Sequence, residues 1–225
     1  MGSRLSNSRL QIFIECQRCF WLLNVCKTCK GPRASNCKRN KHDVWDRPKT
    51  IVAQITNGID KQLKEHYNNF RANNTLPTEL HDKPEFANLS LFPDAKLVDD
   101  YAKAQDYNVG LIYDDASLDS RLNGGLDELF ITNDDKCVPV DFKTSYGTKD
   151  RDKRYEDDIE YGYQIQLSIY AFLLQKLGHE IESYGLLLHY YPKNIQENGN
   201  FEFGLDIIKM PVKVKDAYDL WKDGA

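Results

Sequence analysis

The sequence predicts an α/β or α+β fold in which helices cover a β-sheet. Three features of the residue pattern support this prediction. Apolar residues recur at helical spacing in the N-terminal third, short apolar runs bounded by turn residues follow, and a strongly apolar helical segment separates these runs from two later ones. This order of elements is typical of a sheet with helices packed against it.

The expected helices have apolar residues three or four positions apart, which places them on one helix face. Ser8 and Gln11 have the spacing of a capping box at the start of the first helix, and Pro77 ends the second. Helices are expected at about residues 9–23, 53–71, within 92–104, 161–177 and 214–221.

The expected strands are short apolar runs that end at turn residues. Two of them form a predicted β-hairpin across the polar turn 133–136, and Pro192 is expected to end a later strand. Strands are expected at about residues 107–113, 126–132, 137–142, 184–191 and 201–210.

The length and charge of the chain limit its class. A chain of 225 residues suits one domain, residues 1–225, with a substantial core. No apolar run approaches the roughly 18 residues of a membrane span, and the start of the chain lacks the apolar centre of a signal peptide. We therefore expect a cytoplasmic protein without a membrane partner. The net charge of −4 argues against a protein that coats nucleic acid non-specifically.

Residues 16–49 form a basic, cysteine-rich insertion within the expected domain. Residues 27–49 hold eight Lys or Arg and two Asp, so this segment either faces phosphate groups or forms a solvated loop. The cysteine spacing suits a structural Zn²⁺, with an iron-sulfur centre or reduced, partly buried cysteines as alternatives. The five cysteines are Cys16, Cys19, Cys26, Cys29 and Cys37.

The predicted hairpin carries charged residues inside its apolar strands. Asp141 and Lys143 alternate with an apolar residue and therefore project from one face, and pairing through the turn brings Asp127 close to them. Converging carboxylates need a cation, and their hard oxygen atoms suit Mg²⁺ or Mn²⁺. A lysine beside that ion can position or deprotonate a water molecule, or stabilise charge on a phosphate. The pattern favours phosphodiester hydrolysis, and the alternative is an exposed ion pair on a surface hairpin.

These residues resemble the motifs of the PD-(D/E)xK nuclease superfamily, in particular its RecB-like exonuclease branch, to which some CRISPR-associated nucleases belong. The similar motifs are Gly-x-x-Asp at residues 124–127, Asp-x-Lys at 141–143 and Gln-x-x-x-Tyr at 166–170. Cys16-Gln17-Arg18-Cys19-Phe20 is similar to the Cys-x-Arg-x-Phe sequence near the start of such proteins. The resemblance implies a restriction-endonuclease-like core with a central mixed sheet.

The resemblance also implies roles for individual residues. Asp127, Asp141 and the main-chain carbonyl of Phe142 would bind the divalent metal, and Lys143 would assist the attacking water. Two residues of the following helix, Gln166 and Tyr170, would line the site and meet the nucleic-acid backbone. For Tyr170 the alternative is a core position.

The sequence departs from the family pattern in two places. Where many relatives have a histidine ligand on an early helix, this chain has Asp60, and Glu65 is the next candidate metal ligand. Some relatives bind an iron-sulfur cluster with three cysteines near the C-terminus, but no cysteine follows Cys137 here.

The predicted function is that of an Mg²⁺- or Mn²⁺-dependent deoxyribonuclease, an exonuclease or end-processing enzyme acting on single-stranded DNA or DNA ends. The first alternative is a catalytically inactive nucleic-acid-binding protein of the same fold. The second is an assembly subunit of a repair or CRISPR complex that uses the basic cysteine segment as its interface.

Overall fold

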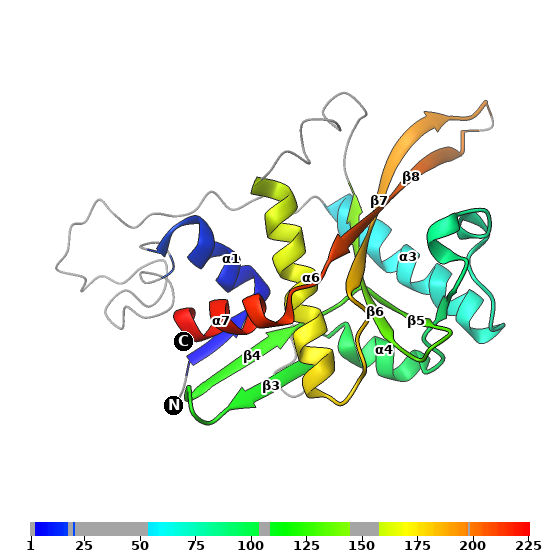
Figure 1. Ribbon diagram of the computed structural model, residues 1–225. Coiled ribbons are helices and arrows are strands. Elements are labelled where there is room, and N and C mark those ends of the chain that lie inside the picture. Colours follow the sequence, from blue (N-terminus) through cyan, green and yellow to red (C-terminus); the bar gives the residue numbers. More distant parts are fainter. Residues whose placement is uncertain (1–2, 18–19, 21–53, 104–108, 145–157, 198) are drawn as a thin grey trace, which may run out of the picture.

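The computed structural model describes residues 3–17, 20, 54–103, 109–144, 158–197 and 199–225 (Figure 1). Its α-helices are α1 (Asn7–Glu15), α3 (Gln54–Ala72), α4 (Ala95–Tyr101), α6 (Asp158–Lys176) and α7 (Val214–Gly224). Its strands are β1 (Ser3–Ser6), β2 (Leu89–Leu91), β3 (Leu111–Asp115), β4 (Ser120–Gly124), β5 (Glu128–Thr132), β6 (Cys137–Thr144), β7 (Tyr184–Ile195) and β8 (Phe201–Pro211). Two short 3₁₀-helices, Thr78–Leu80 and Pro84–Phe86, precede β2. This mixture of helices and mixed sheets confirms the predicted α+β class.

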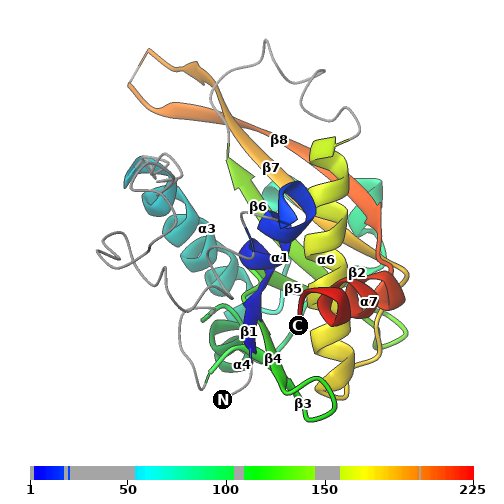
Figure 2. The same ribbon diagram turned by 90° about the vertical axis from the view of Figure 1, so that its left-hand side faces the viewer.

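The larger sheet has five strands in the order β2-β5-β6-β7-β8. The predicted hairpin is present, because β5 and β6 pair antiparallel, whereas β6 and β7 pair parallel and β7 and β8 antiparallel. Helices α3 and α6 lie on opposite faces of this sheet (Figure 2). Strand β6 is buried on both faces as a result, and its charged residues face packed helices rather than open solvent.

The core forms two clusters, one on each face of the five-stranded sheet. On the α3 face, Tyr67 packs with Phe130, Val140 and Leu188. On the α6 face, residues of α6 such as Leu173 pack with α7 and with both sheets. Helix α6 is apolar around most of its circumference because it lies between these elements.

A second sheet of three strands, in the order β1-β4-β3, was not predicted from the sequence. Strand β4 pairs parallel with β1 and antiparallel with β3. The expected strand at 107–113 begins later, at Leu111. Helix α7 closes over this sheet, where Trp221 is fully buried and its indole N–H donates to Ser120 Oγ at 3.0 Å.

The first helix differs from its predicted boundaries. Helix α1 begins at Asn7, with Ser6 as its N-cap, so Ser8 lies inside the first turn and the predicted capping box is wrong. Helix α1 ends at Glu15, where Cys16 adopts an extended conformation, and the described positions 17 and 20 are helical again. The predicted cysteine-rich insertion at 16–49 lies outside the described residues except for positions 16, 17 and 20.

Strand β7 continues past Pro192 to Ile195, so the prediction that Pro192 ends the strand was wrong. The described pairing of β7 with β6 ends at Tyr190, and beyond it β7 pairs with β8 through a bulge at Pro192. Proline lacks an N–H and is tolerated where the ladder is interrupted. The two strands extend from the rest of the protein as a ribbon (Figure 1).

The other predicted helices agree with α3, α4, α6 and α7 within a few residues, and β8 agrees with the predicted strand at 201–210. In the described ranges, every helix is too short or too polar to cross a lipid bilayer.

Candidate active site

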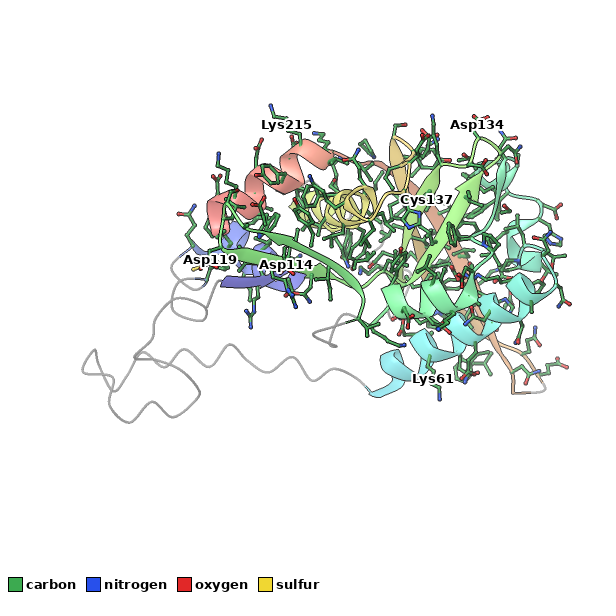
Figure 3. The ribbon with its side chains drawn as sticks, turned by 90° about the horizontal axis from the view of Figure 1, so that it is seen from below. Lys61, Asp114, Asp119, Asp134, Cys137 and Lys215 are labelled. Atoms are coloured by element: carbon green, nitrogen blue, oxygen red, sulfur yellow. The ribbon has the colours of Figure 1, made fainter. Side chains whose placement is uncertain are left out.

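Asp127 lies next to β6 at the open end of the β5–β6 hairpin, opposite the turn. Asp127 precedes β5, and its N–H donates to the Val140 carbonyl at 3.2 Å, which extends the ladder by one residue. Its carboxylate Oδ2 accepts the N–H of Phe142 at 2.8 Å. A main-chain donor thus fixes the Asp127 carboxylate beside the next residues of β6. The hairpin turn, with Asp134, lies at the far end of these strands (Figure 3).

Asp141 and Lys143 lie on the face of β6 that packs on α6, as the alternation of side chains predicts. The Lys143 ammonium group forms an ion pair with Asp141 Oδ2. Gln166 of α6 donates from Nε2 to Asp141 Oδ1 at 2.7 Å, and Lys143 Nζ lies 3.4 Å from Gln166 Oε1. Gln166 Nε2 also donates to the Tyr170 hydroxyl at 2.7 Å. The residues of the second and third motifs therefore form one hydrogen-bonded group.

Helix α3 approaches the same site from the other side and adds a lysine that the sequence interpretation did not select. Lys64 Nζ lies 3.0 Å from Asp127 Oδ1 and 3.1 Å from Asp60 Oδ2. Asp60 therefore reaches the site through Lys64. Glu65, the other candidate on this helix, pairs with Lys61 at 3.7 Å and is 55% exposed, so it lies away from the site.

Burial and charge shift the pKa values of this group. Burial, opposed by Lys143 but reinforced by the nearby Asp127 carboxylate, raises the pKa of Asp141 from 3.8 to about 7. Burial alone would lower the pKa of Lys143, but its charge attraction and hydrogen bond to Asp141, together with the charges of Asp127 and Tyr163, outweigh burial and leave that pKa raised. Burial raises the pKa of Tyr170 well above its usual value, and the two aspartates raise it further. The lysine is charged and the tyrosine neutral near pH 7, whereas Asp141 is close to its midpoint.

The carboxylates of the site offer ligand atoms for a divalent cation, since Asp60, Asp127 and Asp141 face two ammonium groups and leave one negative charge over. Asp141 Oδ2 is buried, and in the described part of the chain it contacts the Lys143 ammonium group without a hydrogen bond of acceptable geometry. The ligand atoms on offer are oxygens, which suit Mg²⁺ or Mn²⁺. No group of three or more His, Cys, Asp or Glu residues among those described could hold a metal ion. Mg²⁺ is commonly held by one or two carboxylates together with water and substrate phosphate, so two carboxylates suffice.

Phe142, the third predicted metal ligand, has its main chain at the site because its N–H binds Asp127. Its side chain points to the α3 face and packs against Tyr67 and Tyr190, with ring centroids 5.1 and 6.2 Å away. This packing holds the main chain of β6 between the two carboxylates.

The glycine of the first motif packs closely against α6. A Cβ atom at Gly124 would lie 3.0 Å from Leu173 Cδ1 and 3.2 Å from the Tyr170 ring. The close approach of α6 leaves little space for a side chain at this position. The residue therefore allows Tyr170, which is 3% exposed, to reach Gln166. Tyr170 is thus both a core residue and a member of the site.

A second residue that the sequence interpretation missed is His189. It lies on β7 in register with Lys143 of the neighbouring strand, and only 4% of its surface is exposed. A polar residue within the apolar run Leu186–Tyr191 was the available signal. Lys64 gave a weaker signal, its position one helical turn after Asp60.

The cysteine prediction is largely outside the described residues, which include none of Cys19, Cys26, Cys29 and Cys37. The structural Zn²⁺ and the iron-sulfur centre therefore stay predictions. Cys137 is a buried free thiol at the start of β6, and burial raises its pKa to about 11 (Figure 3).

No family model matches the sequence, and no curated protein is significantly similar to it. Among solved structures, the chain is similar to that titled "Crystal structure of SSO0001", with 13% sequence identity and a TM-score of 0.39. The match covers 100% of this chain and 76% of that one. A similarity of this size carries no conclusion about fold or function.

Proposed function

We propose that the protein is a metal-dependent nuclease of the PD-(D/E)xK superfamily that hydrolyses phosphodiester bonds in DNA. One observation carries the proposal: Asp141 and Lys143 both contact Gln166, which binds Tyr170, and Asp127 accepts the N–H of Phe142 between them, although the motifs come from separate segments of the chain. A chance Asp-x-Lys sequence on a surface hairpin would leave Asp141 exposed, whereas its side chain is 3% exposed.

The strand arrangement also supports the proposal. Along the chain, α3 comes before the antiparallel β5–β6 hairpin, with β2, α4, β3 and β4 between them, and α6 then leads to β7, which pairs parallel with β6. This order agrees with the restriction-endonuclease-like core that the motif resemblance implies. The catalytic group then lies where the two strands of the hairpin meet α3 and α6.

Each residue has a distinct role in this proposal. Asp127 and Asp141 would hold Mg²⁺ or Mn²⁺, which would polarise the phosphate and lower the pKa of a bound water. Lys143 has a raised pKa, so it acts as a fixed positive charge that stabilises negative charge developing on the phosphate, rather than as a base. Gln166 holds the Asp141 carboxylate in place, and Tyr170 holds Gln166.

The test is cleavage of end-labelled single- and double-stranded DNA, and of matching RNA, with Mg²⁺ or Mn²⁺. Asp141→Asn should reduce cleavage to the uncatalysed background because it removes a metal ligand. Lys143→Ala should lower single-turnover cleavage by about a hundredfold or more while metal binding, measured by calorimetry, persists. The control is Asp134→Asn in the exposed hairpin turn, which should cleave like the wild type.

Two results would contradict the proposal. Unchanged cleavage by Asp141→Asn would show that the activity arises elsewhere. Equal rates for Lys143→Ala and the wild type would show that the lysine only pairs with Asp141.

The contact of Lys64 with Asp127 favours a second candidate, an inactive nucleic-acid-binding protein of the same fold. An ammonium group at 3.0 Å supplies part of the positive charge that a metal would otherwise provide. In that case the protein would bind DNA in Ca²⁺ but would not cleave it in Mg²⁺ or Mn²⁺. The same assays therefore separate the two candidates.

A further inference from the structure

Lys64 lies between the carboxylates of the site and the solvent. The exposed fraction of the side chains rises from 3% at Asp141 to 19% at Asp127 and 29% at Lys64. Asp60, on the outer side of Lys64, is 43% exposed. A substrate that reaches Asp127 from solvent on the α3 side therefore passes the ammonium group of Lys64.

Lys64 also has two separate partners, which fix the position of its charge. Asp60 lies one helical turn earlier on α3 and contacts Nζ at 3.1 Å, while Asp127 belongs to the opposing sheet. A carboxylate offers about four lone-pair sites, so Asp127 can contact both Lys64 and a metal ion. If a cation at Asp127 repels the ammonium group, Asp60 still holds Lys64 at the edge of the site.

The charges of the group match a substrate with a single negative charge. With Asp60, Asp127 and Asp141 all ionised, the three aspartates and two lysines of the group carry a net charge of −1, and a divalent cation changes it to +1. A phosphodiester group has one negative charge and would neutralise the site. Without Lys64, the metal-loaded site would already be neutral and would attract an anion less strongly.

From this geometry we propose that Lys64 binds the phosphodiester group that is cleaved and that Asp60 is a positioning residue for Lys64, an inference that rests on the nuclease function proposed above. Lys64 donates to a phosphate oxygen on the solvent side of the metal, and Lys143 faces the phosphate from the α6 side. Asp60 acts through Lys64 and does not bind the metal directly.

Three measurements on four variants test this role. The variants are Lys64→Gln, Asp60→Asn, the double variant and Lys61→Gln, a matched control whose side chain is 75% exposed on the outer side of α3 (Figure 3). The measurements are Mn²⁺ affinity by calorimetry, affinity for a labelled DNA strand in Ca²⁺, and single-turnover cleavage at saturating Mn²⁺.

Lys64→Gln should weaken DNA binding and slow cleavage, each by roughly 10- to 100-fold, the range expected for a lost charged hydrogen bond. Its Mn²⁺ affinity should stay equal or increase, since a competing positive charge is removed. Asp60→Asn should have a smaller effect of the same kind, and the double variant should be no worse than Lys64→Gln. Lys61→Gln should match the wild type.

Three outcomes would overturn the inference. Wild-type DNA affinity and cleavage in Lys64→Gln would exclude the phosphate contact. A drop in Mn²⁺ affinity confined to Asp60→Asn would make Asp60 a metal ligand, and additive losses in the double variant would separate the two residues. If the wild type binds DNA through Lys64 but cleaves nothing, the phosphate contact stands and the nuclease proposal fails.

Discussion

Two buried carboxylates on neighbouring strands of the same sheet are compensated in different ways. Glu128, at the start of β5, forms an ion pair with Arg71 of α3, and both side chains are 2% exposed. Its Oε1 also accepts the N–H of Leu129 at 2.7 Å. Asp141, on β6, has Lys143 and Gln166 as partners, but a second carboxylate, Asp127, lies close enough to raise its pKa.

The difference lies in what surrounds each pair. Arg71 uses its remaining N–H groups inside the protein, where Nε donates to the Phe92 carbonyl at 2.7 Å and a terminal nitrogen contacts Asn68. The Arg71–Glu128 pair is therefore closed and joins α3 to β5. The Asp141 group instead holds two carboxylates close to each other, and among the described residues Asp141 Oδ2 contacts Lys143 without a well-formed hydrogen bond. The first group therefore joins two elements of the fold, and the second has the composition that the proposed cation site requires.

The largest expected effect on stability comes from Arg71→Met, which leaves Glu128 buried without its cation. Breaking a buried ion pair in this way lowers the free energy of unfolding by about 3–5 kcal/mol. Urea denaturation followed by circular dichroism measures this change. The control is Arg121→Met, whose partner Asp114 is 61% exposed, and we expect a much smaller loss of stability because solvent screens this pair. Equal losses of unfolding free energy in the two variants would show that the buried ion pair contributes no more to stability than the exposed one.

Asp141→Asn should have the opposite effect on stability and should change its pH dependence. Because the folded-state pKa of Asp141, about 7, lies above the unfolded value of 3.8, the folded protein binds more protons between these limits. This group therefore makes the wild type less stable as pH rises from about 4 to 7, by at most about 4 kcal/mol.

The asparagine variant should lose this decline and should be more stable than the wild type at pH 8 in the absence of metal. Urea denaturation from pH 4 to 8 measures the difference between the two proteins. Glu128 has a raised pKa as well, caused mainly by burial, but it is present in both proteins and cancels in the comparison. A pH-independent difference would mean that Asp141 is ionised normally.

The sequence predicted the hairpin and the members of the Asp141 group because both follow from local patterns. The alternation of side chains along a strand places Asp141 and Lys143 on one face of β6. Helical spacing places Gln166 and Tyr170 on one face of α6. The proximity of Asp127 to Asp141 and Lys143 followed from the pairing of two strands across a short turn. The resemblance then linked these segments, which spacing alone could not do.

The remaining features depend on contacts between distant segments. Arg71 and Glu128 are 57 positions apart, and nothing in the residues around either one indicates the other. The parallel pairing of β1 with β4 joins residues 3–6 to 120–123, and both strands are short. Lys64 faces Asp127 only because α3 packs across this part of the sheet through Tyr67. Such contacts are set by the packing of whole elements rather than by local propensity.

The smallest expected effect comes from removing one hydroxyl group on each face of the sheet and comparing the two variants. Tyr170→Phe removes the acceptor of a Gln166 hydrogen bond in the Asp141 group, and Tyr67→Phe removes a buried bond of 2.9 Å to the Tyr190 hydroxyl on the α3 face. Each variant should lose about 1 kcal/mol of unfolding free energy, the usual worth of one such bond. Only Tyr170→Phe should also slow single-turnover cleavage, by roughly 5-fold, because a less constrained Gln166 holds Asp141 less firmly. Parallel urea denaturation and cleavage assays of the two variants measure both quantities. If Tyr67→Phe slowed cleavage as much as Tyr170→Phe, the hydroxyl on the α6 face would contribute only to the core, and the functional difference between the two faces would disappear.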